Sequence, residues 1–224
     1  MRFSRRGVAL LAFASIAIAA VMQPAWAQTA VLTNLADQLV GPEIPANIDV
    51  VALRQQAIDR ITSKVDATAL KRRPIAPQLL QLPQFNFDVA FDPESSLIRP
   101  QSYRTIGRIA DALSDQKLLL YTFLVVDHTE ATGRRDANLM LSQRRANSIR
   151  DALAGTFRIS TKRLQALGLG EEQLQDSSRP ASLANVRAQI VTIGEVHAAV
   201  PSQLTARSVP VGKKGPASAS KKRH

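Results

Sequence analysis

The uncharged run at residues 118–126, LLLYTFLVV, constrains the fold more than any other stretch of the chain. It lacks a regular alternation of apolar and polar residues, which favours a strand buried on both faces of a sheet. The polar segment 127–130 follows directly, and Gly133 supplies a turn before a helix that we expect from Asp136 to about Leu153. Because open α/β sheets bind ligands at the carboxyl ends of their strands, residues 127–130 are candidate site residues.

The helix expected at residues 136–153 carries a charge in the middle of its apolar stripe. Its inward positions recur at steps of three and four residues, and they are Asn138, Leu141, Ser142, Arg145, Ala146, Ile149, Ala152 and Leu153. A buried guanidinium requires an anionic partner, and Glu130 on the preceding loop is a candidate. Glu130 and Arg145 together could hold a ligand that bears both an amine and a carboxylate.

These residues resemble the OmpA-like peptidoglycan-binding domain, which also occurs in peptidoglycan-associated lipoproteins and flagellar stator proteins. Residues 138–153 fit the pattern N-x2-L-S-x2-R-A-x2-V-x3-L with Ile149 in place of Val, and residues 128–133 resemble HTDxxG. The resemblance spans about residues 85–193. It also includes Phe91, Asp92 and Leu97 before the first helix, and the segment Gly168, Leu169, Gly170 and Glu171 near the end.

The resemblance implies noncovalent binding of peptidoglycan through the diaminopimelate of its stem peptide. Carried over to this sequence, the main charged members of the site are Glu130 and Arg145. Thr129, Asn138, Leu141 and Arg187 are the further residues that we expect at the frame or rim of the site.

Three departures from the family pattern affect this expectation. Glu130 replaces Asp, which moves the same charge outward by one methylene, and Asp127 stands where the family usually has Gly. The closing NRRV-type motif reads Asn185-Val186-Arg187-Ala188, so that its first Arg is lost. A site tuned to a zwitterion is sensitive to small displacements, so we expect binding to be weakened or altered.

The same departures motivate an alternative function. In this alternative the domain keeps the fold but has lost the ligand, and it serves as a structural or interaction module for another envelope protein through the N-terminal helix or the tail. It predicts that Glu130→Asp changes little, and that deletion of the residues before Pro74 abolishes partner binding while the domain stays folded.

The N-terminus has the features of a secretory signal peptide over residues 1–27. Arg2, Arg5 and Arg6 precede an apolar run, and Ala25-Trp26-Ala27 fits the small-x-small cleavage rule. The pattern leaves both the general secretory and the twin-arginine route open. The chain has no Cys, which argues against a lipoprotein and against disulfides. We therefore expect a periplasmic protein of the cell envelope, with an outer-membrane association left open.

Residues 28–77 are expected to form an N-terminal extension with one helix and a linker. Asn47 or Asp49 can cap a helix to about Val65, and its apolar stripe consists of Val50, Leu53, Ala57, Ile61 and Val65. This stripe can pack on the following domain, pair with a second copy, or dock on another envelope protein. The basic residues 71–73 before Pro74 are expected to be exposed to solvent.

Residues 196–224 are expected to be a disordered basic tail. Lys213, Lys214, Lys221, Lys222 and Arg223 lie among Gly, Ser, Ala and Pro residues, and they contribute to the formal net charge of +11. No nucleic-acid motif with interleaved aromatics accompanies this charge. We expect the tail either to make a weak electrostatic contact with an anionic polymer or a lipid head group, or to have no specific partner.

The predicted domain, residues 78–195, has four strands and two helices. Strands are expected at residues 85–91, 118–126, 163–169 and 186–193, with helices after Pro100 and after Asp136. This order predicts an α/β (α+β) two-layer sandwich, βαβαββ, in which two helices cover one face of a mixed four-stranded sheet.

Catalysis and metal binding find little support in the sequence. Asp127, His128 and Glu130 could be metal ligands or an acid–base set, yet the chain has only three His, no Cys and no HExxH motif. We expect no enzyme activity, no metal and no cofactor. His128 is expected to hydrogen-bond the loop backbone and to help fix it.

Overall fold

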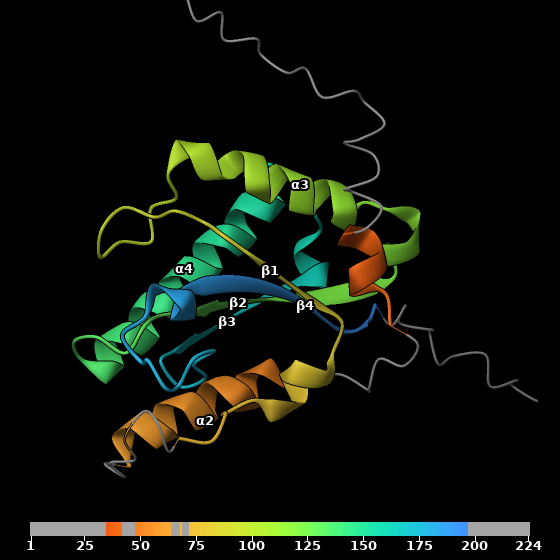
Figure 1. The fold of residues 1–224 in the computed structure, drawn as a ribbon. Coiled ribbons are helices and arrows are strands. Elements are labelled where there is room, and N and C mark those ends of the chain that lie inside the picture. The colour runs from red at the N-terminus through yellow and green to blue at the C-terminus, as the bar shows by residue number, and fades with distance from the viewer. Residues whose placement is uncertain (1–34, 42–47, 64–67, 69–71, 197–224) are drawn as a thin grey trace, which may run out of the picture.

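The computed structural model describes residues 35–41, 48–63, 68 and 72–196, so the predicted signal peptide and basic tail lie outside the described residues. Four strands form one mixed sheet in the order β1-β4-β2-β3 (Figure 1). They are β1 (Gln84–Phe87), β2 (Tyr121–His128), β3 (Leu164–Gly170) and β4 (Arg187–Glu195). β4 is antiparallel to β1 and β2, and β2 is parallel to β3. The predicted mixed βαβαββ sheet is confirmed.

Helices α3 (Tyr103–Leu113) and α4 (Arg135–Gly155) pack on one face of this sheet, as expected. Alternate residues of β2, Phe123 and Val125, point to this face, where they are fully buried. The helices contribute the apolar positions of their inward stripes to the same core, namely Ile106, Ile109, Leu113, Ala146, Ile149 and Leu153. The period-2 pattern of the strand and the 3.6-residue pattern of the helices therefore meet in one apolar layer.

The central strand is displaced from the apolar run that predicted it. Leu118 ends a short 3-10 helix, η4 (Gln116–Leu118), which is capped by the Asp115 side chain accepting from the backbone N–H of Lys117 at 2.9 Å. Leu120 is exposed beside this turn, and the strand starts at the next residue. At its other end β2 continues through Asp127 and His128, which makes these two residues part of the sheet.

Two other boundaries differ from the prediction. Helix α4 begins at Arg135 instead of being capped by Asp136, because the Asp136 carboxylate binds the Arg134 side chain in the first turn. Strand β1 stops at Phe87, and Phe91 forms only an isolated bridge with Ile98. At α4 a local polar contact, and at β1 a turn, therefore shifts the boundary away from the position that the sequence pattern predicted.

The N-terminal helix α2 (Val50–Thr62) covers the second face of the sheet (Figure 1). Asp49 caps it by accepting a hydrogen bond from the Ala52 backbone N–H at 2.9 Å. Its buried side chains join a second apolar core with residues from three strands and from the segment before β1. The core consists of Val50, Leu53, Ala57, Ile75, Ala76, Leu79, Leu82, Leu124, Val126, Leu167, Leu169, Val191 and Ile193. Of the three placements left open by the sequence, packing on the same chain is the one found, and it adds a third layer. No helix in the described ranges is long and apolar enough to cross a membrane.

Arginine contacts fasten the N-terminal segment to the domain. Arg54 of α2 donates from Nη2 to the Ala166 carbonyl oxygen at 2.7 Å. Arg72 pairs with Glu171 at 2.9 Å and with Glu172 at 3.3 Å, and only 11% of its side chain is exposed. The expectation that the basic residues 71–73 are solvent-exposed is therefore wrong for Arg72. Its acidic partners lie about a hundred residues further along the chain, where local sequence patterns give no sign of them.

Candidate functional site

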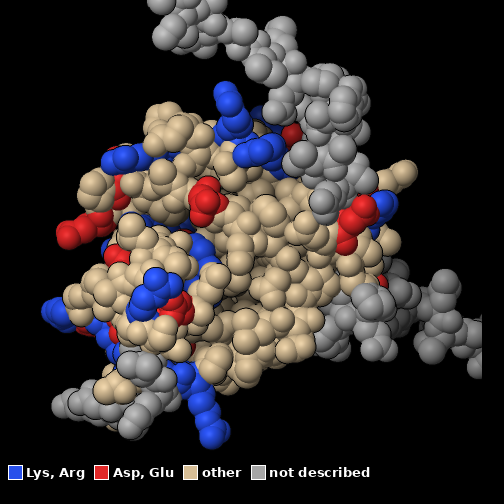
Figure 2. All heavy atoms as spheres, in the orientation of Figure 1, with Lys and Arg blue, Asp and Glu red and all other residues tan. Residues whose placement is uncertain are grey.

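A cavity of about 300 Å³ opens where the carboxyl end of β2 meets the start of β4. Its walls come from the segment after β1, from β2, from α4 and from the loop before β4. The lining residues are Asp88, Val89, Ala90, Phe91, Asp127, Arg145, Leu183, Val186, Arg187 and Ala188. Figure 2 shows charged side chains of both signs toward the left of the view, the side on which the loop between β2 and α4 lies in Figure 1. A binding site at this end of the strands is the location that the sequence predicts.

Arg145 contributes a guanidinium with free donors to this cavity. Its Nε donates to the Ser95 carbonyl oxygen at 3.0 Å, and its guanidinium carbon lies 4.9 Å from the centre of the Phe91 ring. These contacts fix the plane of the group. In the part of the chain that the structure describes, Nη1 and Nη2 of Arg145 have no hydrogen-bond partner, so two adjacent donors remain for a carboxylate.

The predicted ion pair between Glu130 and Arg145 is absent from the described residues. Glu130 is half-buried on the loop after β2, and its Oε1 accepts a hydrogen bond from the Thr132 hydroxyl at 3.2 Å. It does not line the cavity. The local reason is that β2 runs through His128, which places Glu130 beyond the sheet edge.

Asp127 is the buried carboxylate that lines the cavity with Arg145, whereas Asp88, which also lines it, is exposed. It lies on the same face of β2 as Phe123 and Val125, and it is 3% exposed. Its Oδ2 has no hydrogen-bond partner among the described residues. Burial raises the pKa of Asp127 well above its ordinary value, although the charges of Arg145 and Arg187 act in the opposite direction.

His128 faces the opposite side of the sheet from Asp127, where it binds a side chain instead of the expected loop backbone. Its Nε2 lies 2.8 Å from Oε1 of Gln189. The Gln189 amide nitrogen donates to Asn86 at 2.7 Å, so its oxygen is left to accept from His128. Burial, together with the charge of Arg187, lowers the pKa of His128 to about 3. The ring is thus neutral, with the proton on Nε2.

The other predicted site residues support the loop or the neighbouring helix. Thr129 is buried, and its backbone N–H donates to the Gly170 carbonyl at 3.0 Å. The Asn138 amide nitrogen donates to the Thr132 carbonyl at 2.8 Å and to Glu171 Oε2 at 2.8 Å. Thr129, Asn138 and Leu141 do not line the cavity, whereas Arg187 does.

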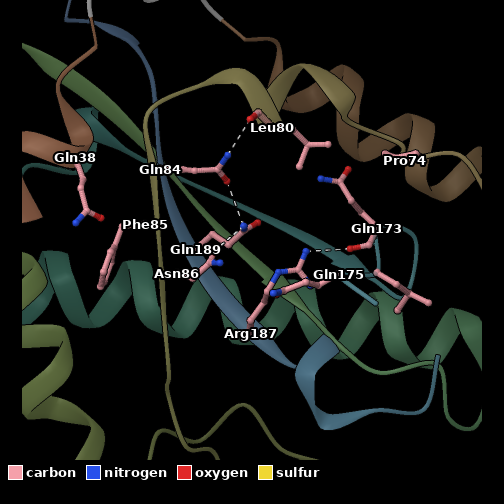
Figure 3. Close-up of a pocket in the computed structure, with 11 residues that line it drawn as sticks. Gln38, Pro74, Leu80, Gln84, Phe85, Asn86, Gln173, Gln175, Arg187 and Gln189 are labelled. Carbon is pink, nitrogen blue, oxygen red and sulfur yellow. Dashed lines mark hydrogen bonds between the residues drawn. The ribbon is translucent and has the colours of Figure 1, made fainter. Parts of the chain in front are cut away.

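Arg187 also lines a second cavity, of about 660 Å³, on the α2 side of the sheet (Figure 3). There its Nη2 donates to the Gln173 carbonyl at 3.0 Å, and burial lowers its pKa to about 10. Amide side chains dominate the wall, which includes Gln38, Gln84, Asn86, Gln173, Gln175 and Gln189. Gln189 of β4 binds both Gln84 and Asn86 of the neighbouring strand β1 along the wall of this cavity, so many of the cavity's polar groups already have partners.

Comparison with known proteins identifies the domain that carries the first cavity. The OmpA family model matches residues 90–191. Residues 90–191 form an OmpA family domain. The OmpA-like domain thus contains β2, β3, α3, α4 and most of β4, together with Asp127 and Arg145, whereas α2 precedes it.

Sequence relatives of the OmpA-like domain include two curated outer-envelope proteins. Outer membrane porin F of Pseudomonas aeruginosa is 32% identical over 97 residues, which are 43% of this chain and 27% of that protein. The peptidoglycan-associated lipoprotein of Brucella melitensis biotype 1 is 35% identical over 85 residues, 38% of this chain and 49% of that protein. The chain therefore matches between about a quarter and a half of the length of these relatives.

Solved structures related to the OmpA-like domain include the peptidoglycan-associated lipoprotein of Burkholderia pseudomallei. It is 24% identical, and the match covers 59% of this chain and 98% of that chain with a TM-score of 0.38.

The sequence reasoning did not place Asp127 beside Arg145 in one cavity. Asp127 entered as one of the candidate residues 127–130 at the end of the strand, as a departure from the family pattern, and as a possible metal ligand or acid–base residue. The alternation of side chains along the strand could have predicted this position, since Asp127 follows Phe123 and Val125 at steps of two on the face that α4 covers. Within the described residues no group of three or more His, Cys, Asp or Glu side chains could hold a metal ion.

Proposed function

We propose that this chain is a periplasmic cell-envelope protein whose OmpA-like domain binds peptidoglycan noncovalently, and that its ligand is the diaminopimelate of the stem peptide. The observation that carries the proposal is Arg145, which lines a cavity of about 300 Å³ and whose Nη1 and Nη2 have no hydrogen-bond partner among the described residues. A fixed guanidinium with parallel free donors suits a carboxylate. The name of the Brucella relative, a peptidoglycan-associated lipoprotein, supports peptidoglycan as the polymer that is bound.

In this proposal the protein anchors or organises the envelope and has no catalytic role. Arg145 binds a carboxylate of the stem peptide, and the loop that Asn138 holds in place forms one side of the entrance. The predicted signal peptide delivers the chain to the periplasm. We also propose that the basic tail makes weak contacts with anionic polymers or lipids, and that the protein contacts a further envelope protein.

Co-sedimentation with diaminopimelate-type peptidoglycan sacculi at moderate salt tests the proposed function. Arg145→Ala removes the free donors, and we expect it to weaken binding by about tenfold or more, the value of a charge-assisted hydrogen bond. Arg144→Ala is the matched control, because Arg144 is the preceding residue of the same helix and is exposed. It removes the same charge and should bind like the wild type.

A second arm separates specific binding from adhesion of the tail. A chain that ends at Val200 lacks the basic residues 213–223. Specific binding requires that this shortened chain still pellets with sacculi and that folded Arg145→Ala does not. If pelleting follows the tail and ignores Arg145, the peptidoglycan proposal is wrong and the alternative of an interaction module without wall binding takes its place.

A further inference from the structure

We propose that Asp127, and not Glu130, is the anionic group that receives the ammonium of the ligand in the OmpA-like domain. This inference rests on the proposed function, because it assigns the second charge of the same site.

The first argument is position. Asp127 on β2 and Arg145 on α4 line one cavity from two different elements, and the charge of Arg145 acts on the Asp127 carboxyl group. Glu130 lines no part of this cavity and is bound to Thr132 on its own loop. A ligand whose carboxylate reaches Arg145 therefore meets Asp127 before any carboxylate of the loop.

The second argument is the unsatisfied state of Asp127. A buried carboxylate normally accepts several hydrogen bonds or an ion pair. Asp127 is 3% exposed, and its Oδ2 has no partner among the described residues. Burial also raises the pKa of Asp127, so the charged form is disfavoured until a cation enters. Groups held in this way are common in binding sites, where the ligand supplies the missing partner.

The third argument is charge balance. Both Arg145 and Arg187 contribute to the wall of the cavity, and both act electrostatically on Asp127. Asp88 also lines the cavity but is exposed, so that water screens its charge. Without Asp127 an entering ammonium group would therefore meet two guanidinium groups with no buried carboxylate beside them. With Asp127 ionised, the cavity offers one buried negative charge next to these positive charges, which suits a zwitterion better than a simple anion.

The cavity also offers a matched control. Asp88 lines the same cavity but is exposed, so its carboxylate keeps its hydration. Asp88→Asn removes the same charge from the rim, Asp127→Asn removes it from the interior, and Glu130→Gln removes it from the loop. Asp127→Gly restores the residue usual in the family at this position and serves as a second interior variant.

Binding of the mature chain and its variants to two preparations of sacculi tests the inference. One preparation is native, and in the other the free amino groups are acetylated, which removes the ammonium. With native sacculi we expect Asp127→Asn and Asp127→Gly to bind about tenfold more weakly than the wild type, and Asp88→Asn and Glu130→Gln to change binding less than about twofold. With acetylated sacculi the wild type should bind as weakly as Asp127→Asn.

The outcomes separate this inference from the proposed function. If the wild type binds and Arg145→Ala does not, while Asp127→Asn binds like the wild type, the inference is wrong and the proposed function stands. A larger loss with Glu130→Gln than with Asp127→Asn also overturns it. If the wild type does not bind sacculi, both the proposed function and the inference about Asp127 are wrong. Thermal unfolding guards against a folding defect: Asp127→Asn should melt no lower than the wild type, because it replaces a carboxyl group whose charged form burial disfavours with a neutral amide of the same shape.

Discussion

The packing of α2 against the sheet leads to a quantitative prediction for Leu53→Ala. Leu53 is 2% exposed and belongs to the apolar core between α2 and the sheet, with Leu124, Leu167 and Val191. Its truncation removes three buried carbon atoms and leaves a cavity that rigid strands cannot close. We expect a loss of about 3 kcal/mol in the free energy of unfolding, within the range for buried leucines.

Urea unfolding followed by far-ultraviolet circular dichroism measures this loss. With a denaturant dependence of about 1.5 kcal/mol per molar urea for a domain of this size, the midpoint should fall by about 2 M. Val51→Ala is the matched control, since Val51 is an apolar residue two positions before Leu53 in α2 and its side chain is 72% exposed. It should change the free energy of unfolding by less than about 0.5 kcal/mol.

The reasoning is refuted if Leu53→Ala and Val51→Ala shift the midpoint equally, because α2 would then not be packed on the domain. The same packing opposes the expectation, drawn from the alternative function, that residues before Pro74 can be deleted without unfolding the domain. Such a deletion uncovers the apolar sheet face formed by Leu124, Val126, Leu167, Leu169, Val191 and Ile193. We expect the shortened chain to aggregate or to lose its cooperative transition.

Two further predictions concern close packing and protonation. Gly168→Ala should lower the free energy of unfolding by about 2–4 kcal/mol or prevent folding. The reason is that the new Cβ would overlap the backbone of α4, within 2.6 Å of the Ser142 carbonyl carbon. In thermal melts Gly155→Ala, whose new Cβ meets no atom within 4 Å, should be nearly neutral. Because its folded pKa of about 3 lies below the ordinary 6.5, His128 contributes stability that is present above pH 6.5 and is lost as the pH falls toward 3. Between pH 7.5 and pH 5, the stability of the wild type relative to His128→Gln should therefore fall by about 2 kcal/mol in urea titrations, and an unchanged difference would contradict the neutral buried ring. Asp127 has a raised pKa and acts in the opposite sense, but it is present in both proteins, so its contribution largely cancels in the comparison.

The sequence by itself determined the elements and their order, and it predicted a site at the end of β2. Apolar periodicity is a local property, and it predicted α3, α4 and the mixed sheet because each element must bury one face. The cap at Asp49 and the stripe of α2 were readable for the same reason. The family resemblance identified Arg145, whose spacing in the helix pattern is also local.

Only the tertiary structure decided which charges meet. Glu130 is close to Arg145 in the chain and carries the family's charge, yet the end of β2 places it outside the cavity. Asp127 enters the cavity because the strand continues past the apolar run, so the pleat turns its side chain toward α4. Arg72 forms ion pairs with Glu171 and Glu172, which lie about a hundred residues further along the chain, and α2 packs on the second face of the sheet. These outcomes depend on distances between elements, which a pattern within one element does not contain.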